Sequence, residues 1–112
     1  MTEVELHGLE VFGHHGVGDE ERDRGQILLW DVAWRVGEVS RDDLSETVDY
    51  VVVAACIKEV SNGRRFQLLE SLAAAAADAI VERFAVEWVR VRVRKPKLDL
   101  SVEFTAATVE RP

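Results

Sequence analysis

The sequence predicts an α+β domain in which a four-stranded antiparallel sheet carries two helices on one face. Three patterns support this class: two segments of strict two-residue alternation, and one long segment with apolar residues at three- and four-residue steps. The elements follow the order ββααββ, so the first two strands and the last two strands should form antiparallel pairs. The length of 112 residues fits one domain, which we place at residues 1–112.

Alternation of apolar and polar residues predicts each strand. The strands are expected at residues 3–12, 26–37, 88–95 and 100–110. The second is the clearest, and the first carries a glycine, Gly8, that suggests a bulge. The third alternates valine with arginine until Pro96, which has no N–H to donate and should end the ladder.

Two helices are predicted between the hairpins. The first begins at Tyr50, with Asp49 as its N-cap, and ends near Ser61. The second spans 67–84, where an alanine run strengthens an apolar stripe with helical spacing. The glycine-rich residues 13–25 show no hydrophobic period and are predicted to form a loop, and the acidic stretch 40–47 a turn with one helical turn at most.

Charge and composition exclude several classes of function. The 14 Lys and Arg against 21 Asp and Glu give a formal charge of −7, which argues against DNA binding and against anionic membranes. No apolar run approaches the roughly 20 residues of a membrane span. A single cysteine, Cys56, lies among apolar residues and is expected to be buried and inert. We expect a reduced, cytoplasmic protein.

The second strand predicts an assembly. It carries apolar residues on both faces, because Leu29 and Ala33 alternate with Trp30 and Trp34. Two helices cover one face of a sheet, so the other face would stay in water in a monomer. Large exposed apolar patches mark interfaces, and we therefore expect a homo-oligomer built through the second face or the edges of the sheet.

Four ionisable side chains are candidates for chemistry: Glu21, Tyr50, Glu70 and Lys95. Glu70 lies at the start of the second helix, where a carboxylate is either favoured by the helix dipole or placed to accept two N–H groups of a flat heterocycle. Lys95 ends the third strand, where a lysine beside a cavity can serve acid–base chemistry. The alternative to a role in chemistry is that Tyr50 only packs against its neighbours and that Glu21 and Lys95 are ordinary solvated charges.

Metal and nucleotide sites are not supported. His14 and His15 are adjacent, and no HExxH or CxxC pattern accompanies them, so no metal is expected. The glycines of 13–25 match neither GxGxxG after a strand nor the P-loop pattern.

Taken in order, several segments resemble the dihydroneopterin aldolase family. The matching stretches are Leu9–Val17, Glu21–Gln26, Asp42–Leu44, Thr47–Tyr50, Phe66–Ala73 and Val93–Pro96. Each is weak alone, whereas the ordered set covers nearly the whole chain and is specific.

The resemblance implies a fold, an assembly and a reaction. The fold is the tunnelling fold, in which the sheets of several subunits join into a ring-shaped β-barrel, a tetramer ring or two stacked rings as an octamer. The active sites lie between neighbouring subunits. The reaction is a retro-aldol cleavage of 7,8-dihydroneopterin in folate biosynthesis that yields 6-hydroxymethyl-7,8-dihydropterin and glycolaldehyde. The family uses neither a metal nor a lysine Schiff base, and no cofactor.

The resemblance also implies binding roles. Glu70 matches the carboxylate that anchors the 2-amino group and a ring N–H of the pterin, with the backbone of Leu69 nearby. Tyr50 matches a tyrosine that reaches in from the neighbouring subunit and stacks near the ring. The backbone of Asp49 and Val51 lines the site beside it.

The catalytic roles implied by the resemblance fall on three residues. Lys95 matches the lysine of the proton-transfer machinery, which acts with water on the side-chain hydroxyl. Tyr50 helps protonate the enol-like intermediate. Glu21, rather than Glu20, matches the loop glutamate that contacts both the substrate side chain and that lysine, because it stands six residues after His15.

Two other functions remain open from the sequence. One is the related dihydroneopterin triphosphate epimerase, which would need convergent cations such as Arg22, Arg24 or the pair Arg64 and Arg65. The other is a non-catalytic pterin-binding ring, although the presence of both Glu21 and Lys95 argues against it. An aldolase could also epimerise its substrate, because cleavage and re-addition invert the hydroxyl-bearing carbon.

Overall fold

The sheet has the predicted antiparallel topology in a computed structural model that describes residues 1–96 and 101–112. Its strands are β1 (Thr2–Gly13), β2 (Gln26–Val36), β3 (Trp88–Pro96) and β4 (Phe104–Arg111). They lie in the order β1-β2-β3-β4, each antiparallel to the next. The α+β class, the ββααββ order and the two hairpin pairs are thereby confirmed.

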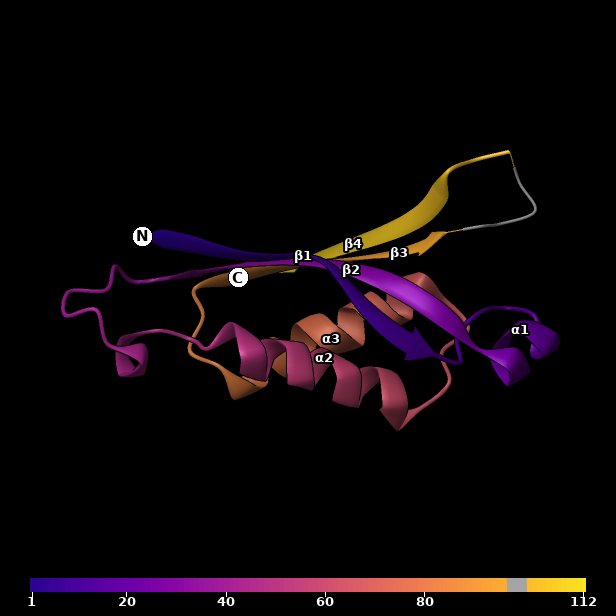
Figure 1. Cartoon of the computed structure of the whole chain (residues 1–112), viewed down its shortest axis with the longest axis horizontal. Helices are drawn as coiled ribbons and strands as arrows, with labels where there is room; N and C mark the ends of the chain where they lie inside the picture. The colour runs from indigo at the N-terminus through magenta and orange to yellow at the C-terminus, as the bar shows by residue number, and fades with distance from the viewer. Residues whose placement is uncertain (97–100) are drawn as a thin grey trace.

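Two long helices cover one face of this sheet. Figure 1 shows α2 (Tyr50–Gly63) and α3 (Leu69–Arg83) side by side beneath it. Alternation along β2 turns Trp30 and Trp34 toward the helices, where both are fully buried. The small alanines of α3 belong to the same core and let the helix approach the sheet closely. In the described parts of the chain, no helix combines the length and the apolar character needed to cross a membrane.

The structure differs from the sequence prediction in two segments. Residues 19–24, expected to be loop, form a short helix, α1 (Asp19–Arg24), with no buried residue and therefore no hydrophobic period. Acidic residues in its first turn and basic residues in its last turn suit the helix dipole. This order of charges is the sequence pattern from which the helix could have been predicted. The last strand begins at Phe104, whereas its predicted start, Leu100, lies outside the described residues.

Other local predictions are confirmed. The register of β1 against β2 shifts between Leu6 and Leu9, and Gly8 adopts a φ of 68° there, as a bulge requires. The Asp49 carboxylate accepts a hydrogen bond from the N–H of Val51 at 2.9 Å and so caps α2. Before it, Leu44–Glu46 form a single 3-10 turn.

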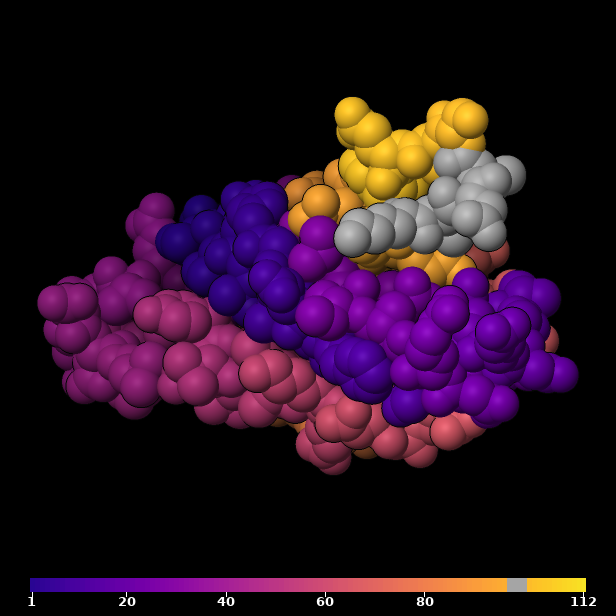
Figure 2. All heavy atoms as spheres, turned by 45° about the vertical axis from the view of Figure 1, so that its right-hand side comes forward, coloured from indigo at the N-terminus to yellow at the C-terminus, as the bar shows by residue number. Residues whose placement is uncertain are grey.

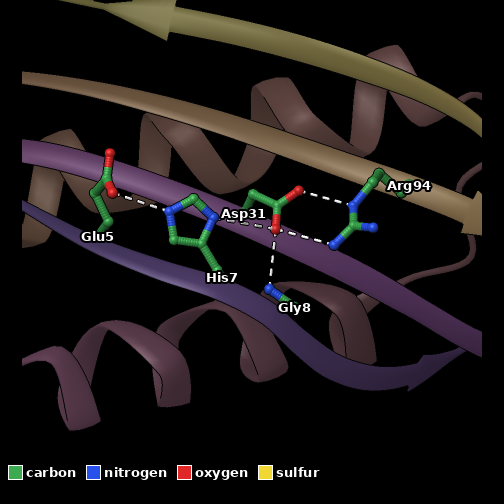
Figure 3. Close-up of polar contacts among 5 residues, drawn as sticks. All are labelled: Glu5, His7, Gly8, Asp31 and Arg94. Carbon is green, nitrogen blue, oxygen red and sulfur yellow. Dashed lines mark hydrogen bonds and ion pairs between the residues drawn. The ribbon is translucent and has the colours of Figure 1, made fainter.

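The face of the sheet opposite the helices carries a charged network at its centre. In Figure 3, Asp31 of β2 accepts two hydrogen bonds from Arg94 of β3, at 2.7 and 3.0 Å, and one from the N–H of Gly8 at 2.9 Å. Burial raises the pKa of Asp31, but these hydrogen bonds outweigh it and hold the pKa below its usual value. His7 extends the network from Asp31 to Glu5.

This network changes the basis of the assembly prediction. β2 does carry Leu29 and Ala33 on the open face, but Leu29 is half-buried and Ala33 is buried, and arginines of β3 flank them. At one end of the same face, however, Phe12 and Ile27 are paired across β1 and β2 and are 52% and 48% exposed, so part of this face is apolar as predicted. The prediction of a homo-oligomer therefore rests on this smaller apolar surface and on the edges of the sheet.

Candidate active site

An open cavity of about 450 Å³ lies where β3 ends and α3 begins, a size that suits a small organic ligand. Its walls come from Val17, from residues 67–70, from Lys95 and from residues 105–108. Four segments of the chain thus meet at one end of the sheet, and Leu69, Glu70 and Lys95 of the predicted site are among their residues.

Lys95 enters the cavity because of the strand period. Val89, Val91 and Val93 face the helices, so Lys95 takes the next position on the same face, just beyond the core. Its ammonium group donates to the Glu21 carboxylate at 2.9 Å, and the two side chains are 13% and 29% exposed. Glu21 and Lys95, 74 residues apart in the chain, thereby form a partly buried, charge-assisted pair beside the cavity.

The loop before α1 is shaped to hold the Glu21 carboxylate. Gly16 has a φ of 145°, and a Cβ atom there would fall 1.3 Å from Oε1 of Glu21. Arg22 donates to the carbonyl groups of Gly16 and Val17 at 2.8 and 2.7 Å and pairs with Asp19. The glycine therefore makes room for the carboxylate, and the arginine fixes the turn around it.

Glu70 lies in the first turn of α3, at a helix end with free donors. The N-cap residue, Leu68, makes no side-chain cap, and helical hydrogen bonding begins when the N–H of Leu72 donates to the Leu68 carbonyl. The N–H groups of the preceding turn are therefore available to a ligand or to water. An exposed carboxylate beside free N–H groups can bind a planar ring that offers both donors and acceptors.

Tyr50, Val51 and Asp49 are not part of this cavity. In Figure 1 the start of α2 lies at the left, whereas α1 and the end of β3 lie at the right. The 14 residues of α2 separate Tyr50 from the cavity end by roughly 20 Å. Figure 2 shows the same separation on the surface, with the magenta residues before α2 at the left and the violet residues around α1 at the right. Tyr50 and Val51 are 57% and 63% exposed.

A buried histidine that the sequence left without a role joins two walls of the cavity. Nδ1 of His15 accepts a hydrogen bond from the N–H of Phe66 at 3.1 Å, and Nε2 lies 2.9 Å from Oγ of Ser61. The N–H of Gly16 donates to the Phe66 carbonyl at 2.9 Å. His15 is only 1% exposed. A histidine inside a polar, glycine-rich segment has no periodic pattern that would reveal such burial.

Other predicted groups have different partners. Among the arginines considered for a triphosphate, Arg22 holds the loop carbonyls, Arg65 pairs with Asp23, and Arg64 stacks on the ring of Phe66. Arg24 lines a separate hollow with Pro96. Within residues 1–96 and 101–112, no group of three or more His, Cys, Asp or Glu side chains is arranged to hold a metal ion. Cys56 is buried, and burial raises the pKa of its thiol.

The buried histidine predicts a pH dependence of stability. Burial lowers the pKa of His15, and the neighbouring His14 acts in the same direction. In the unfolded chain the His15 imidazole therefore binds a proton near pH 6.5, whereas in the folded chain it stays neutral down to a lower pH. The free energy of unfolding should be highest above that pH and fall as the pH drops toward the lower folded pKa, by at most about 1.4 kcal/mol per pH unit.

Urea unfolding between pH 7.5 and 5.5 measures this effect. Because other groups also titrate in that range, the His15→Asn variant serves as the control. Its free energy of unfolding should depend less steeply on pH than that of the unmodified chain, and identical slopes would contradict the prediction.

Comparison with known proteins agrees with this geometry. The family model for dihydroneopterin aldolase (FolB) matches residues 4–111. The dihydroneopterin aldolase of Streptomyces coelicolor is 38% identical over 97% of this chain and 94% of its own. Dihydroneopterin aldolase 1 of Arabidopsis thaliana is also 38% identical, over 85% of this chain and 68% of its own.

A solved structure agrees over the full length. The crystal structure of E. coli dihydroneopterin aldolase in complex with neopterin superimposes with a TM-score of 0.89 at 27% identity, and the match covers all of both chains. The fold is therefore the tunnelling fold of these enzymes, and the chain belongs to the dihydroneopterin aldolase family.

Proposed function

We propose that this chain cleaves 7,8-dihydroneopterin by a retro-aldol reaction, yielding 6-hydroxymethyl-7,8-dihydropterin and glycolaldehyde for folate biosynthesis. The observation that carries this proposal is the meeting of Glu70 with the Lys95–Glu21 pair around one cavity. A ring-binding carboxylate and a proton-transfer pair are the two groups that the reaction needs. The neopterin bound to the E. coli relative supports the choice of a pterin.

The pterin ring would sit at the start of α3. The Glu70 carboxylate accepts hydrogen bonds from the 2-amino group and an adjacent ring N–H, and free N–H groups of the helix start face the ring carbonyl. This places the side chain of the substrate toward Lys95 and Glu21. The backbone of Leu69 completes this wall.

The chemistry then needs one base and one acid. Lys95, through an ordered water and with Glu21 holding its ammonium group, assists removal of the proton from the 2′-hydroxyl. The bond between C1′ and C2′ breaks, C2′ becomes the aldehyde carbon of glycolaldehyde, and the electron pair moves into the C=N bond of the ring. Tyr50 then helps protonate C1′ of the enol-like intermediate. Because the ring itself accepts the electrons, the proposal requires neither a Schiff base nor a metal.

The site must be completed by a second copy of the chain. Tyr50 lies at the far end of α2 from the cavity, and the apolar residues around it are exposed. Asp49 and Val51 would bring their backbone to the neighbouring cavity together with Tyr50. The edge strands β1 and β4 offer unpaired backbone groups through which sheets could join into a ring, a tetramer or a stacked octamer.

Product analysis tests the activity. Incubation with 7,8-dihydroneopterin should release equal amounts of glycolaldehyde and 6-hydroxymethyl-7,8-dihydropterin, measured by chromatography, at the same rate with and without EDTA. Activity that depends on a metal would refute the proposed mechanism. Turnover of dihydroneopterin triphosphate without carbon–carbon cleavage would favour an epimerase instead.

Two substitutions should separate binding from chemistry. Lys95→Ala should leave the Kd of a pterin within about threefold and lower kcat by about 100-fold or more, because it removes a group of the acid–base machinery. Glu70→Gln should raise the Kd strongly, because the charge-assisted pair is worth about 2–4 kcal/mol. Pterin fluorescence titration and steady-state kinetics measure both. Equal loss of binding in the two variants would reassign Lys95.

Mixing inactive variants tests the shared site. Tyr50→Phe and Lys95→Ala should each be impaired, whereas subunits of the two variants, denatured together and refolded, should form some sites with both intact residues. Activity should recover to roughly one quarter of normal if assembly is random. Two Lys95→Ala preparations refolded together are the control, and failure of the mixed sample to recover would show that both residues act within one subunit.

A further inference from the structure

His15 lies at the junction between the two walls of the proposed site. Its Nδ1 atom and the N–H of the next residue, Gly16, bind the two backbone polar groups of one residue, Phe66. Residue 66 is thereby held by a pair of hydrogen bonds at 3.1 and 2.9 Å, much as a residue in a sheet is held by its partner. Phe66 is buried, and its ring lies 5.5 Å from the imidazole ring.

The two sides of this junction lead to different parts of the site. Beyond Gly16 the chain continues to Val17 and Glu21, and Glu21 bonds to Lys95. Beyond Phe66 it continues through residues 67–69 to Glu70. The junction therefore sets the position of the proton-transfer pair relative to the carboxylate proposed to hold the ring.

The two walls differ in how else they are anchored. The wall that carries Glu70, residues 67–70, continues into α3, and Leu72, Ala73 and Ala76 of that helix are fully buried in the core. The Glu21 wall continues into α1, which has no buried residue and is held by hydrogen bonds nearer the surface, such as those of Arg65 to Asp23 and of His14 to the Arg22 carbonyl. Loss of the junction should consequently displace the Glu21 wall and leave the Glu70 wall in place.

The imidazole suits this position because it has two distinct nitrogen atoms. Nδ1 accepts from the Phe66 N–H, so in the neutral ring the proton is on Nε2, which donates to Ser61. A buried N–H without an acceptor is costly, and within residues 1–96 and 101–112 the N–H of Phe66 has no backbone carbonyl as a partner in place of Nδ1. The ring also fills the space beside Gly13, where a Cβ atom would lie 2.5 Å from Nε2.

We propose that His15 is a positioning residue of the aldolase site, whose Nδ1 atom fixes the Glu21 and Lys95 wall against the Glu70 wall through Phe66. This inference rests on the proposed function, and it assigns His15 no contact with the substrate. Its consequence is specific. Without the Nδ1 acceptor the pterin ring still binds, but the Glu21 and Lys95 pair is misplaced relative to the 2′-hydroxyl of the substrate, and kcat falls.

Two variants separate the two nitrogen atoms of His15. In His15→Asn the side-chain oxygen stands where Nδ1 stood, so the Phe66 N–H keeps an acceptor while the contact with Ser61 is lost. In His15→Gln the amide group reaches the position of Nε2, so the contact with Ser61 is kept and the Nδ1 acceptor is lost. Ser61→Ala is the matched control, because it leaves Nδ1 and its bond to Phe66 in place.

Kinetics on 7,8-dihydroneopterin gives the first readout. His15→Gln should lower kcat by about 10- to 100-fold, the scale of one lost buried hydrogen bond, and bind 6-hydroxymethylpterin with unchanged stoichiometry and a Kd within about threefold. His15→Asn and Ser61→Ala should keep kcat within about threefold of the unmodified chain. Equal losses in both His15 variants, or normal kcat in His15→Gln, would overturn the proposal.

Hydrogen exchange of the Phe66 amide gives a readout that does not depend on activity. It should be faster in His15→Gln than in His15→Asn, and equal rates would overturn the proposed hydrogen bond. If the unmodified chain released no glycolaldehyde, the proposed function would fail, and the catalytic part of the inference would fail with it. The amide rates would still show whether His15 holds the junction.

Discussion

The packing of two helices against one face of the sheet is the constraint on which the site depends. Alternation along β2 turns Trp30 and Trp34 toward the helix layer, where both are buried, and the alanines of α3 let that helix lie close to β3 and β4. Once both helices are fixed along the strands, their ends coincide with the ends of the sheet. The start of α3 then falls beside the end of β3, which brings Glu70 near Lys95, and the start of α2 falls at the opposite end.

Charge pairing within the cavity explains what kind of ligand suits it. Lys95 is neutralised by Glu21, so the pair presents a proton donor and an acceptor rather than a net cation. Glu70 has no ion-pair partner among the described residues and stands at the positive end of a helix. Such a site favours a neutral ring with adjacent N–H groups. It opposes a polyphosphate, since the nearby Arg22 is occupied by loop carbonyls and by Asp19.

The sequence predicted the parts of this structure that have a periodic or local signal. The valine–arginine alternation predicts β3 and Asp49 predicts the start of α2, while Glu21, Glu70 and Lys95 are indicated by the motifs that resemble the aldolase family. The helix α1 was missed because it buries nothing, and His15 because its partners, Ser61 and Phe66, are distant in sequence. Contacts between distant segments that lie outside regular elements leave no pattern within either segment.

The same packing makes assembly part of the proposed mechanism rather than an addition to it. α2 is held along the sheet by its buried residues, so no local rearrangement within one copy can carry Tyr50 across the length of that helix. The exposed tyrosine and valines at its start would remain in water in a monomer. If Tyr50 supplies the proton to C1′, it must therefore do so in the cavity of a neighbouring copy. Each subunit then contributes its cavity to one site and the start of its α2 to the site of its neighbour. In a closed ring, every copy makes both contributions.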